Sequence, residues 1–154
     1  MTRTCLFPGT FDPITKGHVD VIRRSLDMFD ELVIGVGVNS SKEPMFPMEQ
    51  RIAWMQEIFK NEPRVRVASY SGLTIRFCQE LGAKYMLRGI RSVGDFEYEK
   101  AIADMNRMLM PEVESVFLTT APLYATVSST LVRDLIRNGA DVGLFVPEEV
   151  VKDL

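Results

Sequence analysis

Phe7-Pro8-Gly9-Thr10-Phe11-Asp12-Pro13-Ile14-Thr15-Lys16-Gly17-His18 is the stretch that decides the fold of this chain. It follows a short apolar segment, Thr4-Cys5-Leu6-Phe7, that is typical of a buried strand. An amphipathic helix comes next, with apolar residues on one face at Val19, Ile22, Leu26 and Phe29. A glycine-containing loop lets the backbone approach a ligand, and the unpaired amides of a first helical turn point outward. The stretch therefore predicts a site for phosphate oxygens, with the only histidine of the chain, His18, at its mouth.

Length and composition indicate an ordinary soluble globular protein. The 154 residues are 46% hydrophobic and 25% charged, which suffices for one core, so we expect a single domain over residues 1–154. No segment reaches the ~20 consecutive apolar residues of a membrane span, and we expect no signal peptide at the N-terminus. Cys5 and Cys78 are expected to be buried free thiols in a reducing compartment, which predicts a cytoplasmic protein.

The charge of the chain argues against a nucleic-acid partner. The formal net charge is −3, whereas a surface that binds DNA or RNA needs a basic excess. Basic residues nevertheless outnumber acidic ones between Arg64 and Arg91. A local basic cluster in an acidic protein fits a small anionic ligand, although a solvated face is the simpler interpretation for most of these residues.

Apolar segments of strand length alternate with helical patterns along the chain. The expected strands are Thr4–Phe7, Leu32–Val38, Val65–Ala68, Tyr85–Arg88 and Ser115–Thr119. This alternation predicts an α/β protein with a Rossmann-like, doubly wound sheet of five parallel strands and helices on both faces.

The expected helices are recognised by apolar residues at helical spacing. The second helix covers 47–61, with Ile52, Met55 and Phe59 on one side, and the third is marked by Leu73, Phe77 and Leu81 and ends at Gly82. The fourth covers 96–110, with Tyr98, Ile102, Met105 and Leu109 in register. A fifth helix carries Leu131, Leu135 and Ile136 and is capped by Ser128 or Ser129, and Pro147 opens a last short helix.

Polar loops follow all five expected strands. They are Gly9-Thr10, Asn39-Ser40-Ser41-Lys42, Gly72-Leu73-Thr74, Arg88-Gly89-Ile90-Arg91 and the stretch from Tyr124 to Thr130. In open parallel sheets, ligands bind at the carboxyl ends of the strands near the switch in strand order. We therefore expect one ligand site formed by these loops at a single edge of the sheet.

Three basic side chains at this edge are candidates for binding an anion. His18 begins a helix rather than lying on its apolar stripe, and an imidazole N–H there can donate to a phosphate oxygen. Lys42 can neutralise a phosphate as a point charge, and Arg88 ends a strand of buried character, which is costly unless the guanidinium meets an anion. A structural histidine and a solvated lysine are the simpler alternatives.

The stretch Val127-Ser128-Ser129-Thr130-Leu131-Val132-Arg133 places three hydroxyls at a helix start. Capping explains one hydroxyl, and the other two predict a second anion site at a helix N-terminus. Arg133 either reaches the same anion or lies on the surface.

Several common enzyme classes are excluded by missing motifs. The chain has no Gly-x-x-x-x-Gly-Lys-Ser/Thr loop for a P-loop enzyme and no Gly-x-Gly-x-x-Gly loop for a dinucleotide cofactor. It has no metal-ligand spacing of His, Cys and Asp, and no Gly-x-Ser-x-Gly turn for a serine hydrolase.

Two motifs resemble signatures of one enzyme superfamily. Thr15-Lys16-Gly17-His18 resembles the Thr/His-x-Gly-His signature of nucleotidyltransferases related to class I aminoacyl-tRNA synthetases. Residues 127–133 resemble the second signature, Ile-Ser-Ser-Thr-x-x-Arg, with Val127 in place of isoleucine.

Within that superfamily the chain resembles, along its whole length, the bacterial phosphopantetheine adenylyltransferases. The matching segments are Pro8-Gly9-Thr10-Phe11-Asp12-Pro13, Ser41-Lys42 with Met45-Phe46, Leu87-Arg88-Gly89-Ile90-Arg91 with Asp95-Phe96-Glu97-Tyr98-Glu99, and Met105-Asn106-Arg107. The block that starts with Arg88-Gly89-Ile90-Arg91 is specific to this family.

The resemblance implies reversible transfer of the adenylyl group of ATP to 4′-phosphopantetheine, without a covalent enzyme intermediate. Magnesium would be held mainly by nucleotide phosphates and water, with no metal ligand from the protein. The family is typically a homohexamer, a dimer of trimers, and is inhibited by coenzyme A. From its charge and from the lack of a long apolar segment, we expect the chain to bind neither nucleic acid nor membranes.

The resemblance also implies roles for particular residues. We expect His18 to stabilise the transition-state oxygens, with help from Lys42, Arg91 and Ser129. Phosphopantetheine would contact Thr10, Lys42, Thr74 and Arg88. ATP would contact Thr10, Phe11, His18, Gly89, Ile90, Arg91, Glu99, Tyr124, Ala125, Thr126, Val127, Ser128, Ser129 and Thr130.

Two alternative functions stay open at this point. The first is an adenylyl- or cytidylyltransferase of the same superfamily that uses another acceptor on the same catalytic face. The second is a nucleotide-binding module without catalysis, because a fold does not fix a function.

Overall fold

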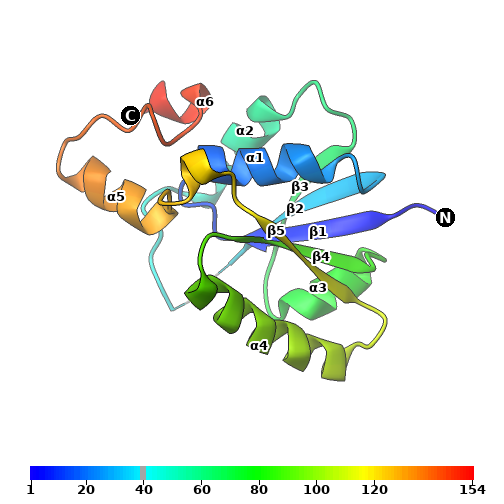
Figure 1. The fold of residues 1–154 in the computed structure, drawn as a ribbon. Helices are drawn as coiled ribbons and strands as arrows, with labels where there is room; N and C mark the ends of the chain where they lie inside the picture. Colours follow the sequence, from blue (N-terminus) through cyan, green and yellow to red (C-terminus); the bar gives the residue numbers. More distant parts are fainter. Residues whose placement is uncertain (39–40) are drawn as a thin grey trace.

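The five strands form one parallel sheet in the order β3-β2-β1-β4-β5 (Figure 1). The strands are β1 (Thr4–Gly9), β2 (Glu31–Gly37), β3 (Val65–Tyr70), β4 (Tyr85–Ile90) and β5 (Glu114–Thr119). The computed structural model describes residues 1–38 and 41–154, so Asn39 and Ser40 of the expected polar loop lie outside the described residues. The predicted Rossmann-like α/β fold is confirmed, and the strand order reverses between β1 and β4.

Helices cover both faces of the sheet. They are α1 (Lys16–Ser25), α2 (Met48–Ile58), α3 (Thr74–Glu80), α4 (Val93–Leu109), α5 (Ser129–Arg137) and α6 (Glu148–Val151), with a short 3-10 helix η1 (Pro122–Tyr124) before α5. In Figure 1, α1, α2 and α6 lie on one side of the sheet, and α3 and α4 lie on the other. Among the described residues, no helix is long and apolar enough to cross a membrane.

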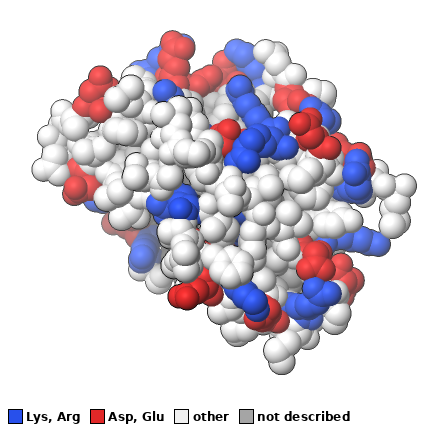
Figure 2. Space-filling view, in the orientation of Figure 1, with Lys and Arg blue, Asp and Glu red and all other residues white. Residues whose placement is uncertain are grey.

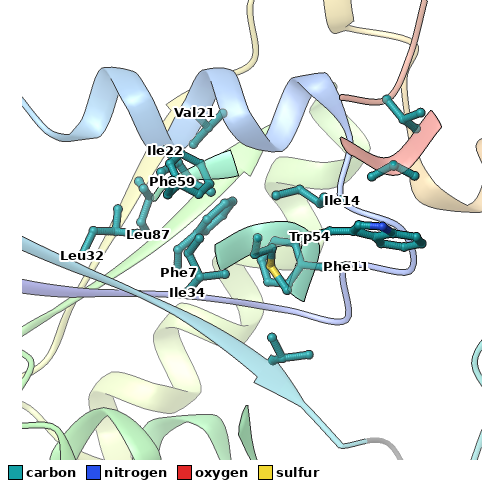
Figure 3. Packing of buried hydrophobic residues seen from close by; sticks show 14 of the residues in the cluster. Phe7, Phe11, Ile14, Val21, Ile22, Leu32, Ile34, Trp54, Phe59 and Leu87 are labelled. Carbon is teal, nitrogen blue, oxygen red and sulfur yellow. The ribbon is translucent and has the colours of Figure 1, made fainter. Parts of the chain in front are cut away.

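The core is divided by the sheet because successive strand residues point to opposite faces. Phe7 of β1 and Ile34 of β2 belong to the larger cluster under α1 and α2, where Ile22 and Trp54 also lie (Figure 3). Leu6, next to Phe7, belongs to the smaller cluster on the other face, together with residues of α3. Strands buried on both faces appear in the sequence as continuous apolar runs, which is why β1 and β2 were predictable.

Strands β1 and β4 pair over a shorter length than the other neighbours. The β1–β2, β2–β3 and β4–β5 ladders each include six residue pairs, whereas β1 and β4 pair only at Cys5–Tyr85 and Leu6–Met86. The two strands therefore separate toward their carboxyl ends. This is the point at which the strand order reverses, so the crevice expected for a ligand opens here.

The predicted C-terminal end of helix α1 was wrong. The helix ends at Ser25, and Leu26 and Phe29 are buried beyond it. The amides of Met28 and Phe29 both donate to the Ser25 carbonyl, at 2.9 and 3.2 Å. This tight turn redirects the chain into β2 while Phe29 stays in the core.

Of the three residues that marked α3 in the sequence, only Leu73 lies away from the packed face. Leu73 is the N-cap residue and is 55% exposed, whereas Ile75 and Cys78 are buried. Phe77 and Leu81 are half-buried and pack against the same cluster, and the ring of Phe77 stacks on Tyr70 of β3 at 4.6 Å. The predicted stop of the helix is confirmed, because Gly82 has a positive φ of 66° directly after the C-cap residue Leu81.

The apolar residues of α4 form the predicted stripe but do not enter the core. Tyr98, Ile102, Met105 and Leu109 are all exposed, and the only buried residue of α4 is Glu99. The two cysteines are buried and free, as expected, on β1 and α3. Pro147 is the N-cap residue of the short helix α6, also as expected.

Candidate active site

Two hollows lie side by side at the carboxyl ends of β1 and β4. The first has a volume of about 910 Å³ and the second about 660 Å³. The residues that line both hollows are Pro8, Gly9, Thr10, Gly37, Val38 and Arg88. Two ligands in these hollows would therefore meet beside Thr10 and Arg88.

The first hollow brings together most residues that the sequence predicted for a nucleotide. Its lining includes Thr10, Phe11, His18, Lys42, Arg88, Gly89, Arg91, Val127, Ser128, Ser129 and Thr130. These residues come from the loops after β1 and β2, from the start of α1, from the end of β4 and the residue after it, and from the start of α5. The expected convergence of segments on one edge of the sheet is confirmed.

The second hollow contains the remaining residue predicted for the acceptor, Thr74. Thr74 lines it together with Thr10 and Arg88, whereas Lys42 lines only the first hollow. Glu99 was predicted to contact ATP, but it lines this second hollow and not the first. Ile90 and residues 124–126 line neither hollow, so a contact from them to ATP stays a prediction.

Helix α4 supplies one wall of the second hollow. Tyr98, Ile102 and Leu109 of its exposed stripe line the hollow, and Asn106 places an amide among them. The sequence predicted that these three residues share one face of the helix, and it did not indicate what that face contacts. A helical apolar stripe has the same spacing whether it packs on a sheet or faces a ligand, so the pattern could not separate the two.

His18 is held at the N-terminus of α1 by its own capping residue. The backbone N–H of Thr15 donates to His18 Nδ1 at 3.0 Å, and Thr15 Oγ1 accepts from the His18 amide at 3.3 Å. A backbone N–H can only donate, so Nδ1 is the unprotonated nitrogen and the ring proton lies on Nε2. The ring of Phe11 packs edge-to-face on the imidazole at 5.0 Å. His18 thus presents a fixed N–H donor to the first hollow.

The imidazole of His18 is neutral at physiological pH. Burial, together with the positive charges of Arg88 and Arg91, lowers the pKa of His18 to about 4. Between pH 6.5 and 4, the unfolded chain binds a proton that the folded chain does not bind. His18 therefore reduces the stability of the free protein as pH falls through this window, and it has no such effect above it.

Arg88 and Glu99 form a bidentate ion pair between the two hollows. Arg88 Nε donates to Glu99 Oε2 at 2.9 Å and Nη2 donates to Oε1 at 2.7 Å. The remaining nitrogen, Nη1, donates to the carbonyl of Pro8 at 2.5 Å, across the gap where β1 and β4 have separated. The sequence predicted that Arg88 would meet an anion, and in this structure the anion is a buried carboxylate of the same chain.

The three hydroxyls at the start of α5 have separate partners. Ser128 is the N-cap residue, and its hydroxyl accepts from the Leu131 amide at 3.2 Å. The hydroxyl of Ser129 donates to the Pro13 carbonyl at 2.7 Å, and Thr130 Oγ1 accepts from Arg133 at 3.3 Å. Ser128, Ser129 and Thr130 line the first hollow, so the N-terminus of the helix is the group that suits an anion here.

Arg133 does not lie free on the surface, and its contact with an anion stays a prediction. Its Nη1 donates to the backbone carbonyl of Asp12 at 2.9 Å, and the half-buried side chain lines the first hollow. Arg133 therefore fixes α5 to the loop after β1 rather than lying free on the surface.

The basic stretch of the sequence does not form a basic surface. Arg64 pairs with Glu62 and Arg66 with Glu31, and only Arg88 and Arg91 of this stretch line the first hollow. Figure 2 shows positive and negative side chains interspersed over this face. The solvated-face interpretation therefore holds for most of these residues.

Sequence reasoning did not identify Asp12 and Arg51 as site residues. Both side chains are buried, with 4% and 3% exposure, and both line the first hollow. Arg51 lies four residues before Met55 on the buried side of α2. A charged residue on an apolar helical face was the signal that could have indicated it.

Comparison with known proteins places the chain in one family. A family model of cytidylyltransferase-like proteins matches residues 6–135. A protein of Flavobacterium psychrophilum named phosphopantetheine adenylyltransferase is 52% identical over 148 residues, which is 96% of this chain and 97% of the relative. Proteins of the same name from Lachnoclostridium phytofermentans and Bacteroides fragilis are 46% and 47% identical over 96% and 95% of this chain, and over 90% and 97% of their own lengths.

The state of His18 predicts an NMR result. Since the chain has one histidine, a ¹⁵N-histidine spectrum reports on His18 alone. We expect the neutral tautomer protonated at Nε2 throughout neutral pH, with a titration midpoint near the lowered pKa of about 4. A midpoint near the ordinary histidine value of about 6.5 would contradict the burial argument.

Proposed function

This chain belongs to the phosphopantetheine adenylyltransferases of the cytidylyltransferase-like family, and we propose that it transfers the adenylyl group of ATP to 4′-phosphopantetheine. The products are dephospho-coenzyme A and pyrophosphate, so the reaction is a reversible step of coenzyme A biosynthesis. The observation that carries the proposal is the pair of hollows that meet at Thr10 and Arg88, because a transfer between two substrates needs both of them at one point.

The chemistry of each hollow suits one of the two substrates. The first hollow combines a fixed imidazole N–H, the guanidinium of Arg91 and the N-terminus of α5, which suits the triphosphate of ATP. The second hollow combines apolar side chains with the Asn106 amide and with the hydroxyls of Tyr70 and Thr74, which lie 2.8 Å apart. Such a mixed lining suits the amide-containing arm of phosphopantetheine.

The proposed reaction needs no general base and no enzyme nucleophile. The acceptor is a phosphate whose second pKa is about 6, so its attacking oxygen is already deprotonated at neutral pH. That oxygen bonds to the α-phosphorus of ATP, and the bond from the α-phosphorus to the oxygen that bridges to the β-phosphorus breaks. Pyrophosphate leaves with the electron pair. Catalysis then consists of in-line positioning and stabilisation of the charge on the transferring group.

His18 would donate its Nε2–H to the oxygens around the α-phosphorus. The neutral ring is suited to this role because it gives a directed hydrogen bond without transferring a proton. Lys42 and Arg91, which line the same hollow, would add positive charge, and Ser129 would contribute its amide at the start of α5. Thr10 would contact both substrates from the shared edge of the two hollows.

Magnesium would enter with the nucleotide. Among the described residues, no group of three or more His, Cys, Asp or Glu side chains is arranged to hold a metal ion. We propose that the ion is bound mainly by the phosphate oxygens of ATP and by water, where it would neutralise phosphate charge.

We also propose that the chain assembles as a homohexamer and is inhibited by coenzyme A. Val93, Met105 and Met108 of α4 are 75%, 65% and 84% exposed, which supports self-association through this helix. Coenzyme A is the product with one further phosphate, so the hollows that bind the product would accept it. The two buried, unpaired cysteines fit a cytoplasmic location.

The proposed function predicts the acceptor that supports pyrophosphate release. We expect release from ATP when 4′-phosphopantetheine is supplied, and at most a trace when nicotinamide mononucleotide or a phosphorylated alcohol replaces it. Replacing ATP by CTP is the matched control for the nucleotide. Release with another acceptor alone would favour a sister transferase, and ATP binding without any release would favour a non-catalytic module.

Replacing His18 by alanine tests its catalytic role. The variant is expected to fold and to bind ATP with little change, but its turnover should fall by about 10²–10³-fold because one transition-state donor is lost. The His18→Gln variant should recover part of the turnover, since its amide can donate from nearly the same place. Near-native turnover of His18→Ala would refute the role.

The exposed residues of α4 predict the effect of charge on assembly. Analytical ultracentrifugation of the chain should show a hexamer, and Met105→Glu with Met108→Glu should shift it to smaller species. The matched control is Leu144→Glu, which alters a residue that is 77% exposed after α5. A monomeric wild-type chain would contradict the proposed assembly.

A further inference from the structure

Asp12 is a buried carboxylate that the proposed mechanism does not use. Its Oδ2 accepts from the backbone amide of Met45 and its Oδ1 from that of Phe46, each at 2.9 Å. The carboxylate therefore connects the loop after β1, which carries Thr10, to the segment before α2, which follows Lys42. Hydrogen bonds to an ionised acceptor are stronger than neutral ones, so this connection is firm.

Arg51 makes a second connection between the same two segments. From α2, its Nε donates to the Phe46 carbonyl at 2.9 Å and its Nη1 donates to the Thr10 carbonyl at 2.6 Å. A guanidinium with 3% exposure is costly to bury, and no carboxylate forms a direct ion pair with it among the described residues. Burial lowers the pKa of Arg51, while the negative charge of Asp12 opposes that change.

The partners of both side chains lie at the active edge of the sheet. Asp12 holds the amides of residues 45 and 46, and Arg51 holds one carbonyl from each segment. The two buried charges thus fix the backbone of Thr10 relative to the backbone that follows Lys42. Lys42 itself is exposed at the first hollow, so its own packing does not determine where its ammonium lies.

We propose that Asp12 and Arg51 are positioning residues that hold the Lys42 segment against the Thr10 loop, so that the Lys42 ammonium and the His18 imidazole face the same phosphate. The inference rests on the proposed function, because it assigns Lys42 to the transferring group. A displacement of about 1 Å at such a group is enough to reduce turnover strongly. These residues would therefore affect catalysis without contacting the substrate.

The Asp12→Asn variant tests the proposal. Its amide keeps one acceptor but turns an NH₂ group toward the second backbone N–H, so one of the two bonds is lost. We expect kcat to fall about tenfold or more, with little change in the KM for ATP. The matched control is Asp30→Asn, since Asp30 also accepts a backbone amide, from Arg3 at 2.8 Å, but next to the amino ends of β1 and β2.

A double-mutant cycle separates positioning from general damage to the fold. In a Lys42→Ala background, Asp12→Asn should reduce kcat by less than about threefold, because the group that it positions is already absent. In an Arg88→Ala background it should cause its full effect. An equal loss in both backgrounds would overturn the proposal.

Amide hydrogen exchange gives a readout that does not depend on activity. The amides of Met45 and Phe46 should lose protection in Asp12→Asn and keep it in Asp30→Asn, and unchanged protection would overturn the proposal. If Asp12→Asn fails to fold, Arg51→Lys takes its place in the cycle, because lysine cannot donate to both carbonyls with the planar geometry of a guanidinium.

Failure of this inference is distinguishable from failure of the proposed function. A wild-type chain that releases no pyrophosphate with phosphopantetheine refutes the function itself. An active wild-type chain in which the loss caused by Asp12→Asn is independent of Lys42 refutes only the positioning role.

Discussion

The separation of β1 from β4 is the constraint on which the site depends. The two strands pair only at their first residues, and beyond Met86 the gap is bridged by the Arg88 guanidinium, which binds the Pro8 carbonyl and the Glu99 carboxylate. Without the gap, the strands would hydrogen-bond to each other and no crevice would exist at the switch in strand order. Without the ion pair, the gap would leave the Pro8 carbonyl without this donor and Glu99 buried without its counter-charge.

The groups around this gap match a reaction in which the substrate supplies the nucleophile. They include a neutral imidazole donor, a helix N-terminus and the six basic side chains of Lys42, Arg51, Arg88, Arg91, Arg133 and Arg137. Both cysteines are far from reactive, because burial raises the pKa of Cys5 strongly and that of Cys78 to about 11. A phosphate acceptor needs no further activation, so the site can consist of donors and cations held in place.

The sequence predicted the sheet, the loops and most residues of the first hollow, because these depend on local patterns. Continuous apolar runs indicate strands covered on both faces, and the chain direction places the following loops at one edge. It did not predict the pair of Arg88 with Glu99 or the contacts of Asp12 with residues 45 and 46. These contacts join different elements, and only the packed topology brings them within hydrogen-bond distance.

Helix α4 shows why an apolar pattern alone could not decide between core and site. Glu99 is the one buried residue of α4. Tyr98 and Ile102 line the second hollow and stay exposed in the free protein. A ligand arm that covers them removes apolar surface from water that folding has left exposed, and this burial favours binding. In our proposal the phosphopantetheine arm completes the packing of α4, while the Glu99 carboxylate on the same helix orients the arginine beside the acceptor phosphate. Tyr98, Ile102 and Leu109 are then part of the binding site, and their hydrophobic free energy contributes to substrate affinity rather than to folding.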